Sequence, residues 1–228
     1  MFLPFSKPTL KYLEEDLVRL TVIEGEKWAY MYGIVINNDK QNFKVFIPNL
    51  VQFLAMDLGI INGKKTDCSI LEPIKDSVYI FSFETIIKDI NEQSKELTLE
   101  KPKNLKEKNL GKIENLLKNL DIEAELEIEY NALGVPHTQK GKTYKILSNG
   151  MSLFTAIPIP NGTILEVVVK IPYKEYIDRK GDKFKAKVVD SKQLEKKKFE
   201  TFLEFETIDE ELKKQIFEFA LINSNIDK

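Results

Sequence analysis

The sequence contains very little of the two residue types that most often bind metals or carry redox chemistry. Among 228 residues there is one cysteine, Cys68, and one histidine, His137. A single cysteine excludes a disulfide within the chain and Cys-x-x-Cys redox chemistry, and the two residues together are too few for a Cys/His zinc site. The small number of cysteine and histidine residues does not exclude a metal site built from carboxylates alone.

Arginine is almost as scarce. Of the 34 basic residues only Arg19 and Arg179 are arginine, and lysine supplies the rest. A guanidinium presents its donors in a planar fork that matches phosphate and guanine edges, whereas an ammonium acts as a point charge. The chain therefore has little of the residue that a phosphate-binding or guanine-binding site uses most readily.

The chain also lacks a strong net charge and long apolar runs. Its formal net charge is -2 and its pI about 5.7, so no overall basic field attracts nucleic acid, and we expect no nucleic-acid partner. The opening MFLPFSKPTL has no basic region followed by a sustained apolar segment. No later run reaches the ~18 apolar residues of a membrane span. We therefore expect a cytoplasmic protein without a membrane span.

The apolar sequence that is present suffices for two small folded domains. Hydrophobic residues make up 43% and charged residues 31%, the proportions of an ordinary globular protein. Short segments rich in β-branched and aromatic residues follow one another and predict a split-barrel-like N-terminal β domain over residues 1–101. They are LVRLTVI, WAYMYGIVI, NFKVFI, DCSILE, SVYIFSFETII and ELTLE.

The pattern becomes helical in residues 102–120. Apolar residues recur there at i, i+3, i+4 and i+7, the spacing of one helical face, and predict a linker helix. They are Ile113, Leu116, Leu117 and Leu120. Gly111 costs a helix interior about 1 kcal/mol, which favours a helix that starts after it.

A second β pattern occupies residues 121–228. EAELEIEY alternates apolar residues with glutamates, as a strand with one solvated face does, and TYKIL, MSLFTAI, TILEVVVKI, FKAKVVD and FETFLEF follow. In the final TIDEELKKQIFEFALI, Thr207 and Glu210 have the spacing of a capping box before an apolar stripe. Six strands and a closing helix predict a second small barrel, so the predicted fold class is mainly β.

Sequence motifs for catalysis or phosphate binding are not found. GKKT from Gly63 and GKT from Gly141 lack the glycine spacing and the following helix of a phosphate loop, and are typical of hairpin turns. The segment around His137 has the composition of an exposed loop, and Cys68 stands in the apolar context of a buried thiol. We identify no catalytic residue and no metal ligand set, and we expect no enzyme.

The second half of the chain resembles the PilZ domain. Members of that family have a turn ending in glycine before a strand, a turn with proline and glycine, an apolar strand ending in proline, and a phenylalanine-bearing strand that leads into a closing helix. The matching features are Gly150, the turn PIPNG, Pro172, and Phe205 before a helix from about Asp209. The resemblance covers about residues 120–222.

The first half is similar to the N-terminal β domain of YcgR-like proteins, which precedes a PilZ domain. The similar segments are GIVINNDKQNFKVFIP, SVYIFSFETII and ELTLEKP. The two resemblances occur in the order that the family has. The chain as a whole thus resembles the bacterial YcgR-like proteins, with an N-terminal YcgR-type β domain and a six-stranded PilZ-like barrel.

That resemblance implies a ligand and a partner. In the family the PilZ domain binds cyclic di-GMP through an Arg-x-x-x-Arg element and an Asp/Asn-x-Ser-x-x-Gly element, and the protein then engages partners such as the flagellar motor. The nearest match to the first element is Lys108 with Lys112. With Gly150 as the family glycine, Lys145 stands at the acidic position and Leu147 at the serine position. Lysine has donors and no acceptor, so the nucleotide site is degenerate.

The predicted function is that of a YcgR-like signalling or adaptor protein of the cyclic di-GMP pathway type. It has no cofactor and acts through a protein partner such as flagellar or surface-motility machinery. The alternative is a receptor for cyclic di-GMP or another anion at an interdomain cleft. The residues that would hold that ligand are Lys108, Lys112, Lys145, Ser148, Asn149 and Gly150.

Overall fold

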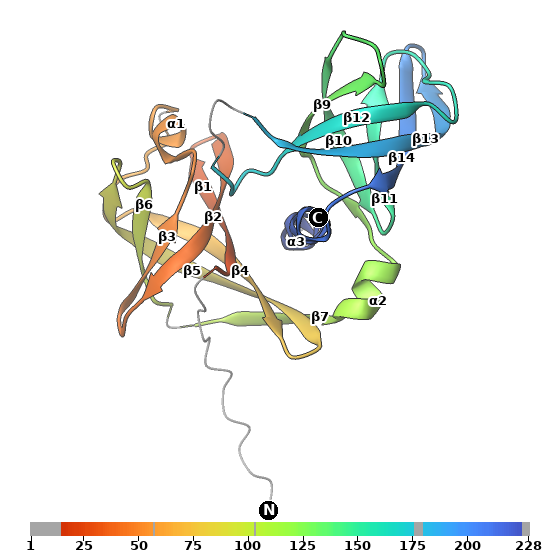
Figure 1. Ribbon diagram of the computed structural model, residues 1–228. Coiled ribbons are helices and arrows are strands. Elements are labelled where there is room, and N and C mark those ends of the chain that lie inside the picture. Colours follow the sequence, from red (N-terminus) through yellow and green to blue (C-terminus); the bar gives the residue numbers. More distant parts are fainter. Residues whose placement is uncertain (1–14, 57, 103, 176–179, 225–228) are drawn as a thin grey trace, which may run out of the picture. The chain divides into compact units, whose positions relative to one another are not determined.

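The computed structural model describes residues 15–56, 58–102, 104–175 and 180–224. The fold is mainly β, as predicted, with two seven-stranded sheets (Figure 1). The chain divides into two compact units, one of residues 1–68 and 82–105 and the other of residues 69–81 and 106–228. Residues 69–81, the end of the β4–β5 hairpin, therefore belong to the second unit. The predicted domain boundaries after residues 101 and 120 stay a prediction.

Six strands of the first sheet form a closed ring. Their order is β4-β1-β2-β3-β6-β5, and a β4–β5 pairing returns to the first strand. Alternation along β1 directs Val18, Leu20 and Val22 into the core, where the ring of Phe43 meets the edge of Phe83 at 6.1 Å. The elements are β1 Leu17–Glu24, β2 Lys27–Asn38, β3 Asn42–Phe46, α1 Leu50–Leu54, β4 Lys65–Ile74, β5 Ser77–Asn91 and β6 Glu96–Glu100.

The linker segment is first a strand and then a helix. β7 (Lys106–Lys112) adds to β5, and α2 (Ile113–Lys118) follows it. The helix starts after Gly111, as the glycine predicted, because the φ of +110° at Gly111 does not fit a helix, while the strand over Lys106–Lys112 was not predicted. The side chain of Asn109 stabilises this break, because its Oδ1 accepts the Gly111 N–H at 2.7 Å.

The second sheet also closes on itself, as the predicted six-stranded barrel. Its order is β11-β14-β13-β12-β9-β10-β8, and a β10–β11 pairing joins the two ends of the six-stranded ring while β8 lies outside it. GKT from Gly141 lies inside β10, so the predicted turn there is wrong. The strands are β8 Asp121–Glu123, β9 Glu127–Ala132, β10 Gln139–Leu147, β11 Gly150–Thr155, β12 Ile164–Lys170, β13 Asp182–Glu195 and β14 Lys198–Thr207.

One buried threonine replaces the backbone ladder where the predicted EAELEIEY strand is interrupted. Residues 124–126 separate β8 from β9, and both of these strands pair with β10. Thr143 of β10 donates its Oγ1–H to Ala124 O at 2.5 Å and accepts from the Leu126 N–H at 2.8 Å. The hydroxyl thereby pairs two backbone groups at a point where the regular ladder cannot reach them.

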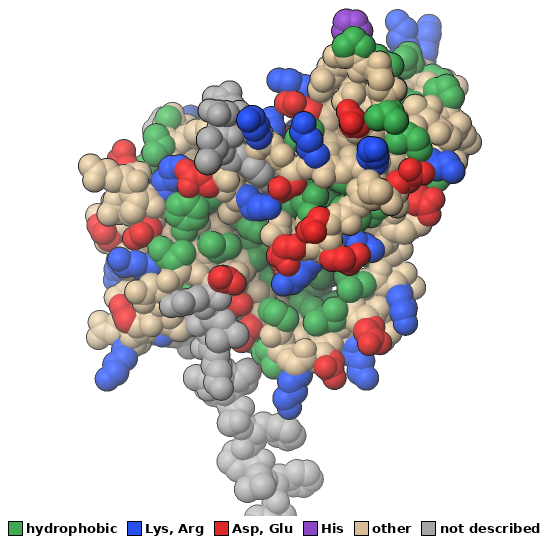
Figure 2. Space-filling model, in the orientation of Figure 1, with side chains coloured by type: hydrophobic (Ala, Val, Ile, Leu, Met, Phe, Trp, Pro, Cys, Tyr) green, Lys and Arg blue, Asp and Glu red, His purple; other side chains and the backbone are tan. Residues whose placement is uncertain are grey.

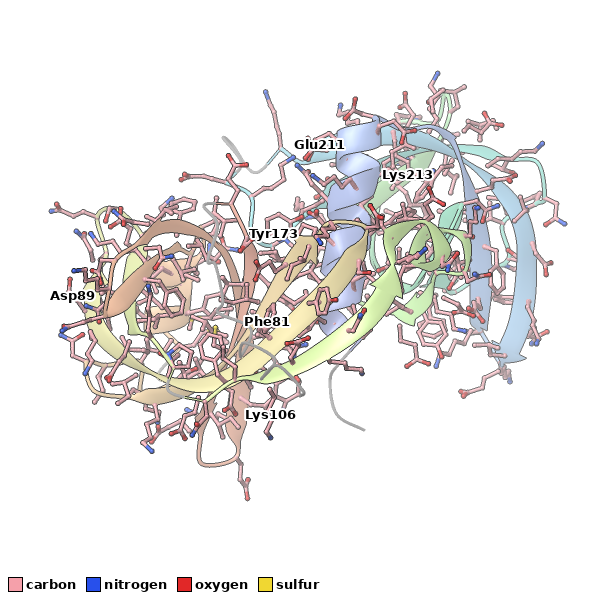
Figure 3. The ribbon with its side chains drawn as sticks, turned by 90° about the horizontal axis from the view of Figure 1, so that it is seen from below. Phe81, Asp89, Lys106, Tyr173, Glu211 and Lys213 are labelled. Carbon is pink, nitrogen blue, oxygen red and sulfur yellow. The ribbon has the colours of Figure 1, made fainter. Side chains whose placement is uncertain are left out.

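Helix α3 (Glu210–Asn223) packs on β8 and β10 and belongs to the core of the second unit. Asp209 is its N-cap, because its carboxylate accepts from the Glu211 and Leu212 N–H groups. The cap predicted at Thr207 is therefore misplaced by two residues. Tyr173, labelled in Figure 3, donates its hydroxyl to Gln215 O of α3 at 3.1 Å. Of the helices in the described ranges, none is long and apolar enough to cross a membrane.

Replacement of Thr143 by valine keeps the shape of the side chain and removes both hydrogen bonds. Two buried backbone groups then lose their partner, so we expect a loss of about 2 to 4 kcal/mol in the free energy of unfolding, measured by urea denaturation. Thr163→Val is the matched control, because its Oγ1 bonds Pro160 O at an exposed site. An equal effect of the two substitutions would contradict this account.

Candidate functional site

The turn between β10 and β11 holds three of the residues predicted to contact a ligand. Ser148 and Asn149 form the two-residue connection, and Gly150 pairs with Leu147 as the first residue of β11. Asn149 joins this turn to β14, because its O accepts from the Phe205 N–H at 2.9 Å. Its Nδ2 also donates to the Glu204 Oε1 at 3.1 Å. The polar groups of the turn thus bond to the barrel itself.

Gly150 is required by close backbone packing. Its φ is outside the left-handed range, so its turn does not need the freedom that glycine gives. A Cβ at this position would overlap the carbonyl oxygen of Leu203 and lie 2.9 Å from the Leu203 carbonyl carbon. The glycine therefore lets β11 run against β14, which positions the turn.

Lys145, at the position where the PilZ family has an acidic residue, is already paired. It lies on the outer face of β10 opposite Ser152 of β11, and its Nζ is 3.1 Å from the Asp121 Oδ1. The hydrogen bond to Asp121 raises the pKa of the Lys145 ammonium, so the cationic form is favoured. A ligand phosphate would have to compete with this carboxylate for the ammonium.

Aromatic rings cover the barrel next to this ion pair. Tyr144 and Phe154 stack with ring centroids 4.6 Å apart, and the Nζ of Lys198 lies 4.5 Å from the centroid of Phe154. The Tyr144 hydroxyl donates to the Glu123 Oε1 at 3.0 Å, and this hydrogen bond raises the pKa of the phenol. These residues form a packed surface from β8, β10, β11 and β14.

A buried carboxylate lies on the same face. Glu200 of β14 is 8% exposed, and it accepts a hydrogen bond of 2.9 Å from the Oγ of Ser152, which is fully buried. Together with Asp121 and Glu123 it makes this face of the barrel rich in carboxylates. Such a face favours cations over anions.

Two hollows adjoin the turn and share Asn149 and Glu204 as lining residues. The first, of about 590 Å³, is lined by four carboxylate side chains and one lysine. The second, of about 370 Å³, is largely apolar and lies against Leu147, at the position of the family serine. The charged residues of the first hollow are Glu204, Glu206, Asp209, Glu210 and Lys213, and Figure 3 labels Lys213 near Glu211 on α3.

Lys108 and Lys112 belong to another sheet. Both are exposed residues of β7, which pairs with β5, whereas Lys145 is on β10. Arg19 is on β1 and 6% exposed, and Arg179 lies outside the described residues. The structure therefore brings Lys145 and the 148–150 turn together, and it places Lys108 and Lys112 on a separate element.

The other candidates for chemistry are accounted for by the fold. His137 is exposed in the β9–β10 connection, as predicted. Cys68 is buried, and this burial raises the pKa of its thiol well above the usual value, so the reactive thiolate is disfavoured. Within the described part of the chain, no group of three or more His, Cys, Asp or Glu side chains is placed to hold a metal ion.

The sequence did not identify Asp121, Glu123, Ser152 and Glu200 as part of this face. Asp121 is 24 positions before Lys145, its ion-pair partner, and Ser152 bonds a residue 48 positions away. The glutamates of EAELEIEY were predicted to form the solvated face of a strand, and most of them are exposed. Only the pairing of β8 and β14 with their neighbours shows which carboxylates lie beside Lys145 and its neighbours on this face.

No protein-family model matches the chain, and a comparison with curated proteins finds no match. Three solved structures are similar along most of their length. The Bacillus subtilis inhibitor of motility MotI/DgrA is 15% identical, with a TM-score of 0.41 over 94% of this chain and 98% of that one. YcgR of Escherichia coli, in complex with c-di-GMP, is 10% identical, with a TM-score of 0.30 over 88% and 80%. MrkH of K. pneumonia, also with c-di-GMP, is 8% identical, with a TM-score of 0.33 over 91% and 86%.

In its fold, the chain is similar to YcgR-like proteins. YcgR, whose family the sequence resemblance named, is among these structures. At these identities the likeness concerns the fold alone. The ligand in two of the complexes and the action on motility belong to those proteins.

Substitution of Gly150 by alanine tests the close approach of β11 to β14. The added Cβ forces the backbone of β14 away, so we expect a loss of about 1 to 3 kcal/mol in the free energy of unfolding, measured by urea denaturation. Gly141→Ala in β10 is the control, because the nearest atom to its Cβ, on Tyr130, is 3.5 Å away. Comparable stability of Gly150→Ala and the wild type would show that the two strands can separate without cost.

Proposed function

We propose that this chain is a YcgR-like adaptor of the cyclic di-GMP pathway type whose PilZ-like barrel has a degenerate nucleotide site. It acts in the bacterial cytoplasm through contact with a protein partner, of which flagellar or surface-motility machinery is the expected kind. The observation that carries this proposal is the ion pair between Lys145 and Asp121 at the position where the family reads its ligand.

The proposal rests first on the chemistry of the ligand positions. Cyclic di-GMP presents two anionic phosphates, and guanine edges that offer N–H donors to an acceptor on the protein. Lys145 has no acceptor, and its charge already bonds Asp121. Leu147 places an apolar side chain where a hydroxyl is needed. Loss of two charge-assisted contacts, at roughly 1.5 to 3 kcal/mol each, removes about two to four decades of affinity.

Electrostatics at the turn also oppose an anionic dinucleotide. The larger hollow beside Asn149 has four carboxylates against Lys213. Glu200 and Glu123 lie on the adjoining outer face. A ligand with two phosphates would lose hydration here and meet like charges, which costs free energy at both steps.

Titration of the purified full chain with cyclic di-GMP tests the proposal. We expect no saturable binding at low micromolar ligand by calorimetry, because the acceptor and the arginine forks are absent. Saturable low-micromolar binding by the wild type would overturn the degenerate-site proposal in favour of the lysine receptor. In that case Lys108→Ala and Lys112→Ala should abolish it.

A variant that restores the family's ligand-binding residues tests the proposal in the opposite direction. Lys145→Asp with Leu147→Ser restores the second family element, and Lys108→Arg with Lys112→Arg restores the first. Asp121→Asn prevents two carboxylates from facing each other. We expect this variant to bind cyclic di-GMP at least about a hundredfold more tightly than the wild type. A variant with Lys142→Asp, Glu125→Gln and Leu117→Ser, which makes the same net change of charge and polarity elsewhere in the second unit, should not.

A further inference from the structure

Three connections of the second barrel meet at one end of it. Residues 133–138 join β9 to β10, residues 156–163 join β11 to β12, and Lys196 and Lys197 turn β13 into β14. The Leu133 N–H donates to Ile164 O at 3.0 Å, and the Gly162 N–H donates to Val188 O at 2.8 Å. These bonds hold the first two connections against β12 and β13, and the pairing of Thr155 with Phe199 places the lysine turn beside the start of the β11–β12 connection. The end of the barrel that the three connections form is here called the loop end.

Aliphatic side chains project from the loop end into solvent. Leu133 is 54% exposed and Val135 44%, both in the β9–β10 connection, while Ile157 in the β11–β12 connection is 65% exposed. Leu194, two residues before the lysine turn, is 43% exposed. Single exposed aliphatic residues are ordinary, but four of them at one end of a barrel, from two connections and from β13, suggest an apolar contact.

The same end carries four lysines of the β13–β14 hairpin, where strand pairing places Glu200 opposite Lys192 and Glu195 opposite Lys198. Among the described residues, Lys192, Lys196 and Lys197 have no ion pair, and Lys198 has only its contact with the ring of Phe154. Lys142 on β10, by contrast, lies 3.0 Å from a carboxylate oxygen of Glu125. Figure 2 shows lysine side chains at the upper right over the end of the β13–β14 hairpin, with hydrophobic side chains beside them.

We propose that the loop end docks on the surface of a membrane that contains anionic lipids. The aliphatic side chains enter the boundary between headgroups and acyl chains, which removes their apolar surface from water. The lysines lie along this boundary with their ammonium groups among the anionic headgroups. The apolar and the cationic residues thus serve one contact, and the protein lies on the bilayer without crossing it.

The chemistry of the loop end favours lipid over nucleic acid or a protein partner. Single-stranded nucleic acid is bound by exposed aromatic platforms, and base edges are read mainly by arginine, amide or carboxylate side chains. The four apolar residues here are aliphatic and the cations are all lysine, and the ring of Phe154 beneath Lys198 already stacks with Tyr144. Protein hot spots are enriched in Trp, Tyr and Arg set in pockets, whereas these side chains are exposed on two connections and the end of a hairpin.

Co-sedimentation of the full chain with lipid vesicles tests this inference. We expect the protein to bind vesicles of phosphatidylcholine mixed with phosphatidylglycerol, to bind pure phosphatidylcholine far more weakly, and to dissociate as salt is raised. Lys196→Gln with Lys197→Gln should weaken the partition coefficient roughly 30-fold, at about one decade or less per lysine. Lys183→Gln with Lys185→Gln, which removes the same charge from exposed residues at the other end of β13, should leave it almost unchanged.

Substitutions of the exposed aliphatic residues distinguish binding to lipid from binding to a soluble polyanion. Ile157→Ser with Leu194→Ser should weaken vesicle binding by about tenfold or more while the unfolding midpoint is unchanged, because both side chains are exposed. No binding to anionic vesicles at low salt would overturn the proposal. Equal losses of vesicle binding for the two pairs of Lys→Gln substitutions would also overturn it. A third contradicting outcome is binding to heparin that is as strong as binding to vesicles and is unchanged by the two serine substitutions. The inference is independent of the proposed function, because cyclic di-GMP titration and vesicle binding use different residues.

Discussion

The close approach of β11 to β14 at Gly150 is the constraint on which the candidate site depends. Without a side chain at this position, the two backbones can lie close enough for the turn to bond to β14 through Asn149. Strand β11 also pairs with β10, and this pairing closes the barrel. Closure directs alternate residues of β10 and β11 outward, and this places Lys145 and Ser152 on one outer face.

That outer face is satisfied by the protein's own groups. Lys145 bonds Asp121, Ser152 bonds Glu200, and Tyr144 bonds Glu123. Each of these bonds joins strands that are distant in the sequence, so the polar groups that a ligand would use instead stabilise the barrel. The hydrogen-bonding groups of this face are paired within the fold, and its carboxylates disfavour a bound anion. Both features support the proposal of a degenerate nucleotide site.

Local patterns predicted most of the strands, because alternation of apolar and polar residues reflects burial of one face. The errors arose where tertiary contacts decide between similar local patterns. The apolar spacing and Gly111 predicted a helix after Gly111, but not the strand β7 over Lys106–Lys112, which forms because β5 offers a strand to pair with. GKT at Gly141 has turn composition and lies within β10, since β9 lies opposite it. Thr207 and Asp209 both fit a cap, and the path of β14 into α3 selects Asp209.

The sequence by itself determined that the chain is mainly β, with two barrels and a closing helix, because these follow from periodicity along short segments. It also determined the scarcity of arginine and the presence of Lys145 and Leu147 before Gly150, since these are matters of identity and spacing. Only the tertiary structure decided that Asp121 neutralises Lys145, that carboxylates line the hollow at Asn149, and that four lysines and four aliphatic residues gather at the loop end. The physical reason is that strand register and barrel closure, which sequence periodicity does not specify, bring these distant residues together.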